Sequence, residues 1–386
     1  MLGSPQVLLA ALVALLSPAH SRSADVPRID NPAKAPSSRA VRLEELWRIG
    51  GDSEAEGEFF GKIGDLVVGA DGRVYVLDQQ TNDVRVFTKD GEYERTFGRE
   101  GDGPGEFRDP AGLVRTPDDR IGVYRTSPPR ISIFERDGTY VSEFYFTPDP
   151  EHDFQYLSSI RCRGGVFVTS GVDTRQGDNG MEQVIRLMQF DAAGNFACEL
   201  ANIVRRFDFG NFVVRDDPQP YAVLSSDGRA YVMTGWDYEI AAHGPDCEVD
   251  RVIARKYEPR RRTGAEIEAI TEYYRRGGGT QGARIEISKV DRDVAWMGVR
   301  DDGNLWVLSS RSRFNLAADS LGVFDVYDRA GRLIESADLK GEGNPQTDRY
   351  FLLGDRFFVV TRASAPRDGT VDDAEPMGVI CYRVPE

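Results

Sequence analysis

A short apolar segment that recurs six times constrains the fold of this chain more than any other feature. It reads VYVLD at 74–78, IGVYR at 121–125, VFVTS at 166–170, AYVMT at 230–234, LWVLS at 305–309 and FFVVT at 357–361. Its β-branched and aromatic residues are typical of strands. A turn signal precedes each copy, such as Asp71-Gly72 before the first, and another apolar run precedes each turn. The pattern therefore predicts six β-hairpins.

Two further strands extend each hairpin. After the first copy, residues 83–98 read DVRVFTKDGEYERTFG, which is a strand, an Asp-Gly turn and a strand, and residues 130–144 repeat this plan. Successive copies start 45 to 75 residues apart, and four antiparallel strands at such intervals are typical of a β-propeller blade. With 40 glycines and 20 prolines to supply the turns, residues 41–386 are predicted to form an all-β, six-bladed β-propeller.

The glycine-rich stretch at 98–109 raises the alternative of a phosphate-binding loop. It reads GREGDGPGEFRD, and this spacing is neither GxGxxG nor a Walker pattern. A phosphate loop also needs a helix behind it, whereas a strand is predicted here. The stretch falls where the fourth strand of one blade must cross to the first strand of the next. We therefore interpret it as a connector in which Phe107 packs between blades.

The two ends of the propeller are predicted to pair. The last repeat, at 349–384, supplies only three strands before the chain ends. A fourth strand is available at 41–49, VRLEELWRI, because this segment precedes a second connector-like stretch at 49–60. An N-terminal strand that completes the last blade closes the ring and removes an exposed sheet edge.

The first forty residues are predicted to lie outside the propeller. An apolar run from Val7 to Leu16, followed by small and polar residues, is typical of a secretory signal peptide, here predicted at 1–21. The run is too short to span a bilayer. Because no Lys or Arg precedes it, a buried or disordered N-terminus stays open as the alternative. Residues 22–40, with three prolines, are predicted to be a flexible leader. We expect a secreted or periplasmic protein without membrane insertion after removal of the signal.

Charge and composition exclude several classes of function. A net charge of −15 repels phosphate backbones and anionic lipid, so nucleic acid is not an expected partner. The three histidines are scattered, and the spacing of the four cysteines matches no zinc pattern. We therefore expect no metal and no cofactor, and we predict a monomer.

The four cysteines are expected to stay unpaired. Cys162 is predicted in a first strand, Cys198 and Cys247 in the fourth strands of different blades, and Cys381 in a third strand. The first and fourth strands of one blade lie about 14 Å apart at about 4.8 Å per step. A disulfide needs Cα atoms within about 7 Å.

The sequence DVRVFTKDGEYERTFGREGDGPGEFRDPAGL at 83–113 resembles the NHL repeat, with its strand, Asp-Gly turn and GPGEF signature. The resemblance covers about 63–145 and implies a propeller similar to secreted bacterial six-bladed proteins of NHL type. Relatives of this architecture include a lyase that acts on peptidyl hydroxyglycine, lactonases and interaction modules. None of their catalytic patterns matches residues of this chain.

An insertion at 256–293 interrupts the path between blades four and five. Thr263 is a predicted N-cap for a short helix over about 265–276, which ends at the glycines 277–279. One face of this helix carries three apolar residues: Ile267, Ile270 and Tyr274. Two interpretations stay open, a lid over a ligand site or a helix packed on the propeller rim. The apolar stripe alone favours the packed helix.

The candidate site lies on the face that carries the blade connectors and the loops between second and third strands. The candidate ligand-binding residues stand at or just beyond the ends of the recurring segments: Asp78, Arg125, Trp236, Arg311, Arg313 and Arg362. Converging arginines in an acidic protein would bind a carboxylate or a phosphate. The alternative is that each arginine pairs with a neighbouring carboxylate.

Two functions compete. The first is an exported, non-catalytic binding module that presents one propeller face to a protein, peptide or carbohydrate ligand of anionic character. The second is an exported lyase or hydrolase that uses the mouth of the central channel, with a bound divalent ion. The scarcity of histidines and the lack of a matching catalytic signature favour the first function. No catalytic residue is assigned.

Overall fold

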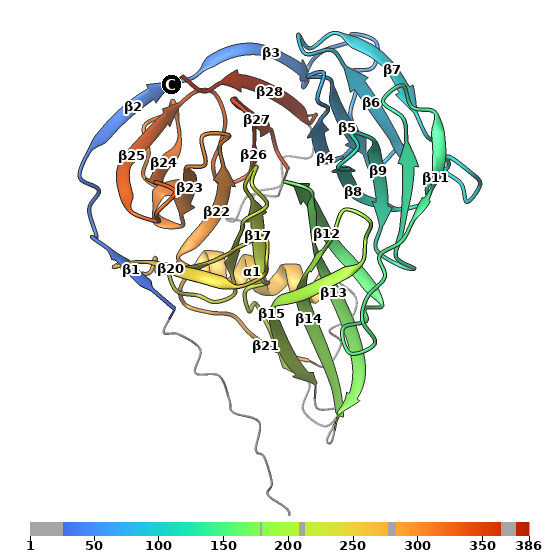
Figure 1. The fold of residues 1–386 in the computed structure, drawn as a ribbon. Helices are drawn as coiled ribbons and strands as arrows, with labels where there is room; N and C mark the ends of the chain where they lie inside the picture. The colour runs from blue at the N-terminus through green and yellow to red at the C-terminus, as the bar shows by residue number, and fades with distance from the viewer. Residues whose placement is uncertain (1–25, 178–179, 208–212, 277–282, 364–375, 386) are drawn as a thin grey trace, which may run out of the picture.

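The computed structural model describes residues 26–177, 180–207, 213–276, 283–363 and 376–385. Within them, six sheets of antiparallel strands stand radially around a central axis (Figure 1), which confirms the predicted six-bladed β-propeller. The predicted signal peptide at 1–21 lies outside the described residues.

Each blade runs outward from a strand beside the axis. The innermost strands are β4 (Ile63–Val68), β8 (Pro110–Arg115), β12 (Tyr156–Arg163), β17 (Tyr221–Leu224), β22 (Val294–Val299) and β26 (Arg349–Leu353). The second strands, which contain the recurring segments, are β5 (Val74–Asp78), β9 (Ile121–Arg125), β13 (Val166–Gly177), β18 (Ala230–Met233), β23 (Leu305–Ser309) and β27 (Arg356–Val360). The third strands are β6 (Asp83–Phe87), β10 (Arg130–Phe134), β14 (Gly180–Phe190), β19 (Glu239–His243), β24 (Ser320–Tyr327) and β28 (Gly378–Arg383). The fourth strands are β7 (Tyr93–Phe97), β11 (Tyr140–Phe144), β15 (Phe196–Phe207), β20 (Val249–Arg255), β25 (Leu333–Lys340) and β3 (Glu44–Gly50).

The ring closes through the N-terminal strand. β3 pairs antiparallel with β28, with Ile49 opposite Val379 and Trp47 opposite Cys381, so the predicted closure is confirmed. The strand begins at Glu44 rather than at residue 41. Its pairing satisfies backbone groups that the three-stranded last repeat would leave exposed.

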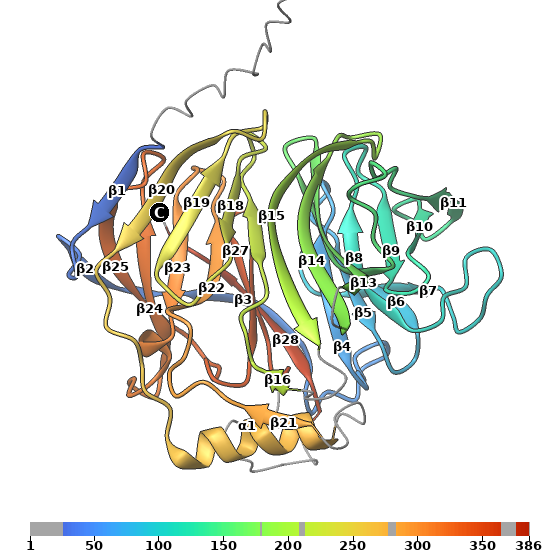
Figure 2. The same cartoon turned by 90° about the horizontal axis from the view of Figure 1, so that it is seen from below.

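The predicted flexible leader at 22–40 is wrong for much of its described part. β1 (Arg28–Asn31) pairs in parallel with β20, and β2 (Ser38–Arg42) pairs in parallel with β25 (Figure 2). The outer edges of blades four and five carry free backbone donors and acceptors, and these two strands satisfy them. The side-chain amide of Asn31 also donates to the Ala254 carbonyl, 223 residues away in sequence. A local sequence pattern cannot indicate a partner so far along the chain.

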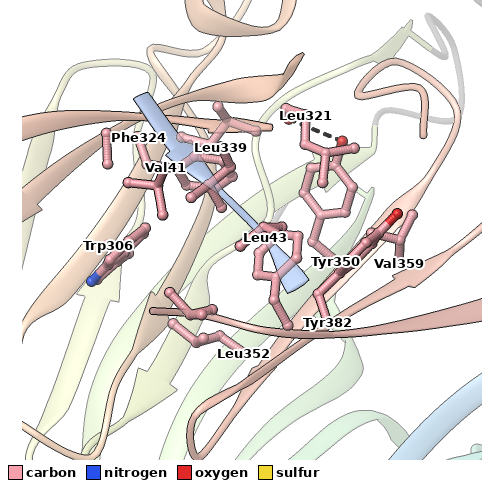
Figure 3. Packing of buried hydrophobic residues seen from close by; sticks show 14 of the residues in the cluster. Val41, Leu43, Trp306, Leu321, Phe324, Leu339, Tyr350, Leu352, Val359 and Tyr382 are labelled. Carbon is pink, nitrogen blue, oxygen red and sulfur yellow. Dashed lines mark hydrogen bonds between the residues drawn. The ribbon is translucent and has the colours of Figure 1, made fainter. Parts of the chain in front are cut away.

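Apolar side chains fill the wedges between adjacent blades. Figure 3 shows the cluster between blades five and six, in which Val41 and Leu43 of the N-terminal segment are buried among side chains such as Leu339 and Tyr382. The Tyr350 hydroxyl in this cluster donates to the Leu321 carbonyl at 3.0 Å. Burial of such side chains is the main stabilising contribution to a blade interface. The N-terminal segment therefore contributes to the core as well as to the sheets.

The glycine-rich stretch at 98–109 is a connector, as predicted. It links β7 to β8, and Phe107 within it is 3% exposed and packs on Phe134 with ring centroids 5.9 Å apart. At Gly98 the backbone has a φ of +80°, and a Cβ added there would lie 2.0 Å from Phe107 Cζ. Glycine is therefore required by the packing between blades one and two.

The prediction that the cysteines stay unpaired is wrong for one pair. Cys198 in β15 forms a disulfide with Cys247, and their Cα atoms lie 6.3 Å apart. Cys247 lies in the turn between β19 and β20, not in an outer strand. A turn of blade four thus contacts the outer strand of blade three. The prediction was based on distances between strands of one blade, so it did not include contacts between blades. Cys162 and Cys381 are free thiols.

The insertion contains α1 (Gly264–Arg276), which confirms the predicted helix. Thr263 Oγ1 accepts a bond of 3.2 Å from the Glu266 amide, and the Glu266 carboxylate accepts one of 2.8 Å from the Thr263 amide. This is a capping box. Nearby, β16 (Val213–Arg215) and β21 (Arg284–Glu286) form a separate parallel pair. Figure 2 shows all three elements beneath one face of the propeller. The glycines 277–279 lie outside the described residues.

Candidate functional site

A passage follows the propeller axis. It consists of a turn-side cavity of about 430 Å³, a middle cavity of about 330 Å³ and a helix-side mouth of about 430 Å³. The turn-side cavity lies beside the turns between first and second strands, and it shares Arg161 and Arg163 with the middle cavity. The middle cavity shares Tyr221, Arg292 and Ala295 with the mouth. The three cavities are therefore contiguous.

The helix-side mouth is built from loops that are far apart in sequence. Residues 216–220 follow β16, Trp236 follows β18, Arg313 ends the short helix η1 (Arg311–Arg313), and Ile270 comes from α1. Half-buried Trp236 presents an aromatic surface. The volume of the mouth lies within the usual range of small-molecule sites. The helix lies on this face, and its Ile270 lines the mouth.

A network of ion pairs fixes the insertion beside the mouth. The Asp291 carboxylate is 2% exposed and accepts bonds of 2.8 Å from both Arg260 and Arg262. Arg262 also pairs with Asp216, and Arg260 with Glu266 at 2.8 Å. These contacts join the segment that begins α1, the loop after β16 and the segment before β22. These buried ion pairs hold the insertion against the propeller, which is a structural role.

One carboxyl group behind the mouth has a shifted titration. Burial, together with the neighbouring charge of Asp237, raises the pKa of Asp293 to about 6, although a bond from the Tyr238 amide opposes the shift. Asp293 is 5% exposed and its amide donates to the Trp236 carbonyl at 2.7 Å. It does not line any of the three cavities. We therefore assign this carboxyl to the framework that holds the Trp236 loop.

The middle cavity has a different chemistry. Four arginines line it, Arg161, Arg163, Arg292 and Arg349, and its lining contains no carboxylate among the residues that the structure describes. The Arg161 side chain keeps 41% of its surface accessible within the passage. Burial raises the pKa of Tyr221, whereas the charges of Arg161 and Arg292 oppose that rise. This cavity is the most electropositive part of the passage.

The structure brings two of the six predicted site residues to the mouth, Trp236 and Arg313. Asp78 is fully buried, and its carboxylate accepts bonds from the Gly61, Lys62 and Gln80 amides at 2.8 to 3.0 Å. It therefore holds a loop in place and is not available to a ligand.

The other three predicted arginines lie beside the blade loops and line none of the three cavities. Arg125 donates to the Pro128 carbonyl at 3.1 Å and lies 3.7 Å from Asp102. Arg311 pairs with Glu258 at 2.5 Å. The Arg362 guanidinium donates to the Pro376 carbonyl at 3.3 Å. For Arg125 and Arg311, pairing with a neighbouring carboxylate is what the structure shows.

Arg161, Arg292 and Arg349 were not among the predicted site residues. The predicted residues stand at the ends of the second strands, which are one strand away from the axis, whereas the innermost strands line the passage. A signal was available, because Arg161 stands within β12 and Arg349 begins β26. A charged residue in an innermost strand is expensive to bury and therefore points to the channel.

Two further observations bear on chemistry and location. Among the described residues, no group of three His, Cys, Asp or Glu side chains is arranged to hold a metal ion. No helix in the described part of the chain is long and apolar enough to cross a membrane.

Comparisons with known proteins agree with this architecture. Residues 57–144 match the family model DUF5128, described as a 6-bladed beta-propeller. A predicted exported protein from Bacteroides fragilis is similar in structure, with a TM-score of 0.53 and 11% identity over 93% of this chain and 99% of the other. A member of the duf4221 family from Bacteroides vulgatus is similar with a TM-score of 0.52 and 10% identity, over 91% of this chain and 100% of the other. No curated protein sequence matches the chain. These similarities show the fold alone.

Proposed function

We propose that this protein is an exported binding module that takes an anionic ligand at the helix-side mouth. The observation that carries the proposal is the mouth itself, a cavity of about 430 Å³ that is lined by Trp236, Ile270 and Arg313 from three separate segments of the chain. An aromatic surface, an apolar contact and a guanidinium group together suit a ligand with an apolar body and a carboxylate or phosphate. Peptides and acidic sugars both have this character.

Export is supported by three independent features. The apolar run from Val7 to Leu16 has the composition of a signal peptide. The Cys198–Cys247 disulfide suits an oxidising compartment such as the periplasm or the exterior. The similar protein from Bacteroides fragilis is itself described as a predicted exported protein.

Binding is favoured over catalysis by the chemistry of the passage. An acid–base mechanism needs a titratable group that reaches the ligand. The carboxyl with the most suitable pKa, that of Asp293, does not line the cavities. Three aspartates line the mouth, and two of them, Asp216 and Asp291, are held by Arg262. A propeller can recognise a ligand at such a mouth without catalysing a reaction.

The proposal is tested by thermal shift and calorimetry with carboxylate-bearing peptides, uronic acids and phosphate esters. We expect at least one of these classes to raise the melting temperature of the wild-type protein. Trp236→Ala and Arg313→Gln should each weaken its binding by about tenfold, equivalent to about 1.4 kcal/mol. Arg311→Gln is the matched control, because Arg311 lies in the same short helix but pairs with Glu258. A ligand that binds all four proteins equally places the binding site elsewhere and overturns the proposal.

A further inference from the structure

We propose that the middle cavity is a second, separate site that binds a compact multivalent oxyanion, either phosphate or a small dicarboxylate. It goes beyond the function proposed above, because neither α1 nor Trp236 nor Arg313 lines this cavity. The site lies between the blades, and its ligand is held by the innermost strands and the residues next to them.

The first support is the composition of the wall. Arg161, Arg163, Arg292 and Arg349 face a volume of about 330 Å³, and none of the described residues that line it is Asp or Glu. The rest of the wall is neutral, with Tyr221, Trp296 and Tyr350 among its side chains. The whole chain carries a net charge of −15. A local excess of positive charge in such a protein runs against its general field.

The second support is how these arginines are partnered. Arg163 is neutralised, since it pairs with Asp301 and donates to the Val299 carbonyl at 2.7 Å. The guanidinium of Arg349 donates to the Gly64 carbonyl, which carries no formal charge. Arg292 donates to the Ala295 carbonyl at 3.5 Å and has a further interaction. The Gly64 carbonyl positions the Arg349 side chain but does not neutralise its positive charge.

Arg161 is the key member of the group. Its nearest recorded carboxylate is Asp65, at 4.0 Å from Nη1. That carboxylate already accepts bonds from the Leu66 amide at 3.0 Å and the Leu113 amide at 3.1 Å. Asp65 lines the turn-side cavity and not the middle cavity. Nη1 of Arg161 donates to the Ile160 carbonyl at 2.8 Å, and the side chain lines the middle cavity. A guanidinium has several further N–H donors, and its planar fork matches an oxyanion.

The passage allows a small ion to reach the site. The middle cavity joins the mouth through Tyr221, Arg292 and Ala295, and it joins the turn-side cavity through Arg161 and Arg163. Guanidinium groups gathered in a partly enclosed space repel one another, and an anion between them removes that cost. An oxyanion bound by two or more forks makes charge-assisted hydrogen bonds, which are stronger than neutral ones.

The test is calorimetric titration of the full-length protein with inorganic phosphate and, separately, with succinate, in a low-salt buffer free of both. Arg161→Gln and Arg349→Gln are expected to weaken binding by about tenfold or more. Two controls keep their affinity: Trp236→Ala changes the mouth alone, and Arg356→Gln changes the turn-side cavity alone. Tighter binding of phosphate than of succinate identifies a phosphate-type ligand, and the reverse order identifies a carboxylate.

Three results would overturn the inference. The first is no binding of either anion by the wild-type protein at about 10 mM. The second is equal affinity of the wild-type protein and a folded Arg161→Gln variant. The third is an equal loss in Trp236→Ala, which would place the anion at the mouth. If Arg161→Gln does not fold, the affinity of Arg349→Gln for the anions replaces it as the test. Competition between phosphate and succinate in the wild-type protein then shows whether both bind at one site. These outcomes do not bear on the binding of larger ligands at the mouth, so the two proposals are tested independently.

Discussion

The helix-side mouth and the middle cavity share a wall, yet they treat charge in opposite ways. The mouth carries three arginines and three aspartates, and its most buried carboxylate, Asp291, is held by two guanidinium groups. The middle cavity carries four arginines and no carboxylate among its described lining residues. Ion pairs at the mouth fasten a long insertion to the ring, so the fold explains them. In the middle cavity Asp301 neutralises Arg163. By contrast, Arg161 has its nearest carboxylate at 4.0 Å, and Arg349 donates to a backbone carbonyl. This difference distinguishes the structural network from the proposed ligand site.

The largest effect is expected from breaking the network at the mouth. Asp291→Ala leaves Arg260 and Arg262 without their shared, buried partner. Removal of one member of a buried ion pair costs about 3–5 kcal/mol, because the remaining charge stays desolvated. The free energy of unfolding, measured with urea, should fall by that amount.

The control for this variant is Asp217→Ala. Asp217 lines the same mouth but is only half-buried, so its loss should change the free energy of unfolding by about 0.5 kcal/mol or less. Equal stabilities of the two variants would show that the mouth network does not support the fold, and the contrast with the middle cavity would then disappear.

A smaller loss is expected from removal of the disulfide. Replacement of Cys198 and Cys247 by serine frees a loop with a sequence separation of 49 residues, which should cost about 2–4 kcal/mol of stability. Cys247 lies in a turn between third and fourth strands, on the face opposite the mouth. Ligand affinity at the mouth should therefore stay constant while stability falls. Reductant should destabilise the wild-type protein but leave the double variant unchanged, and a loss of affinity would contradict this separation.

The third effect is a pH dependence of stability that comes from Asp293. Its pKa is about 6 in the folded protein and 3.8 ordinarily, so the folded state binds the proton more tightly. This contribution to stability is fully present below pH 4 and is lost as the pH rises through about 6. Asp293→Asn does not titrate. Its free energy of unfolding relative to the wild-type protein should therefore rise by about 2 kcal/mol between pH 4 and pH 7.

The comparison for Asp293 is Asp237→Asn. It removes the neighbouring charge, which is the second cause of the raised pKa after burial, so it should reduce the pH dependence without abolishing it. A constant difference between Asp293→Asn and the wild-type protein across this range would show that the carboxyl titrates normally.

The blades could be predicted from the sequence because their determinants are local. Runs of apolar residues mark the strands, and Asp-Gly turns mark several of the reversals, as at Gly72 and Gly91, where φ is +83° and +86°. Ring closure followed from counting strands. The parallel strands β1 and β2 and the Cys198–Cys247 bridge could not be predicted in this way, because each joins segments whose proximity depends on the finished ring.

The site was only partly predictable for a similar reason. The loops after the second strands do reach the mouth, which is why Trp236 and Arg313 were found. The arginines of the middle cavity stand in or beside innermost strands, and a strand pattern does not show which side chains face the axis. Arg161 lies between Ile160 and Cys162, in a run that reads as an ordinary strand.

Only a small change in stability is expected from Arg161→Met, and this variant tests the comparison most directly. Arg161 has Asp65 at 4.0 Å, and that carboxylate keeps both of its backbone donors when the guanidinium is removed. The loss of this attraction is offset by the repulsion that Arg161 exerts on the other arginines of the cavity. Unfolding in anion-free buffer should therefore change by about 1 kcal/mol or less. Phosphate or succinate at about 100 times its dissociation constant should stabilise the wild-type protein by about 2.7 kcal/mol and the variant much less. A loss as large as that of Asp291→Ala would mean that Arg161 belongs to the structural network, and the middle cavity would then be an extension of the mouth.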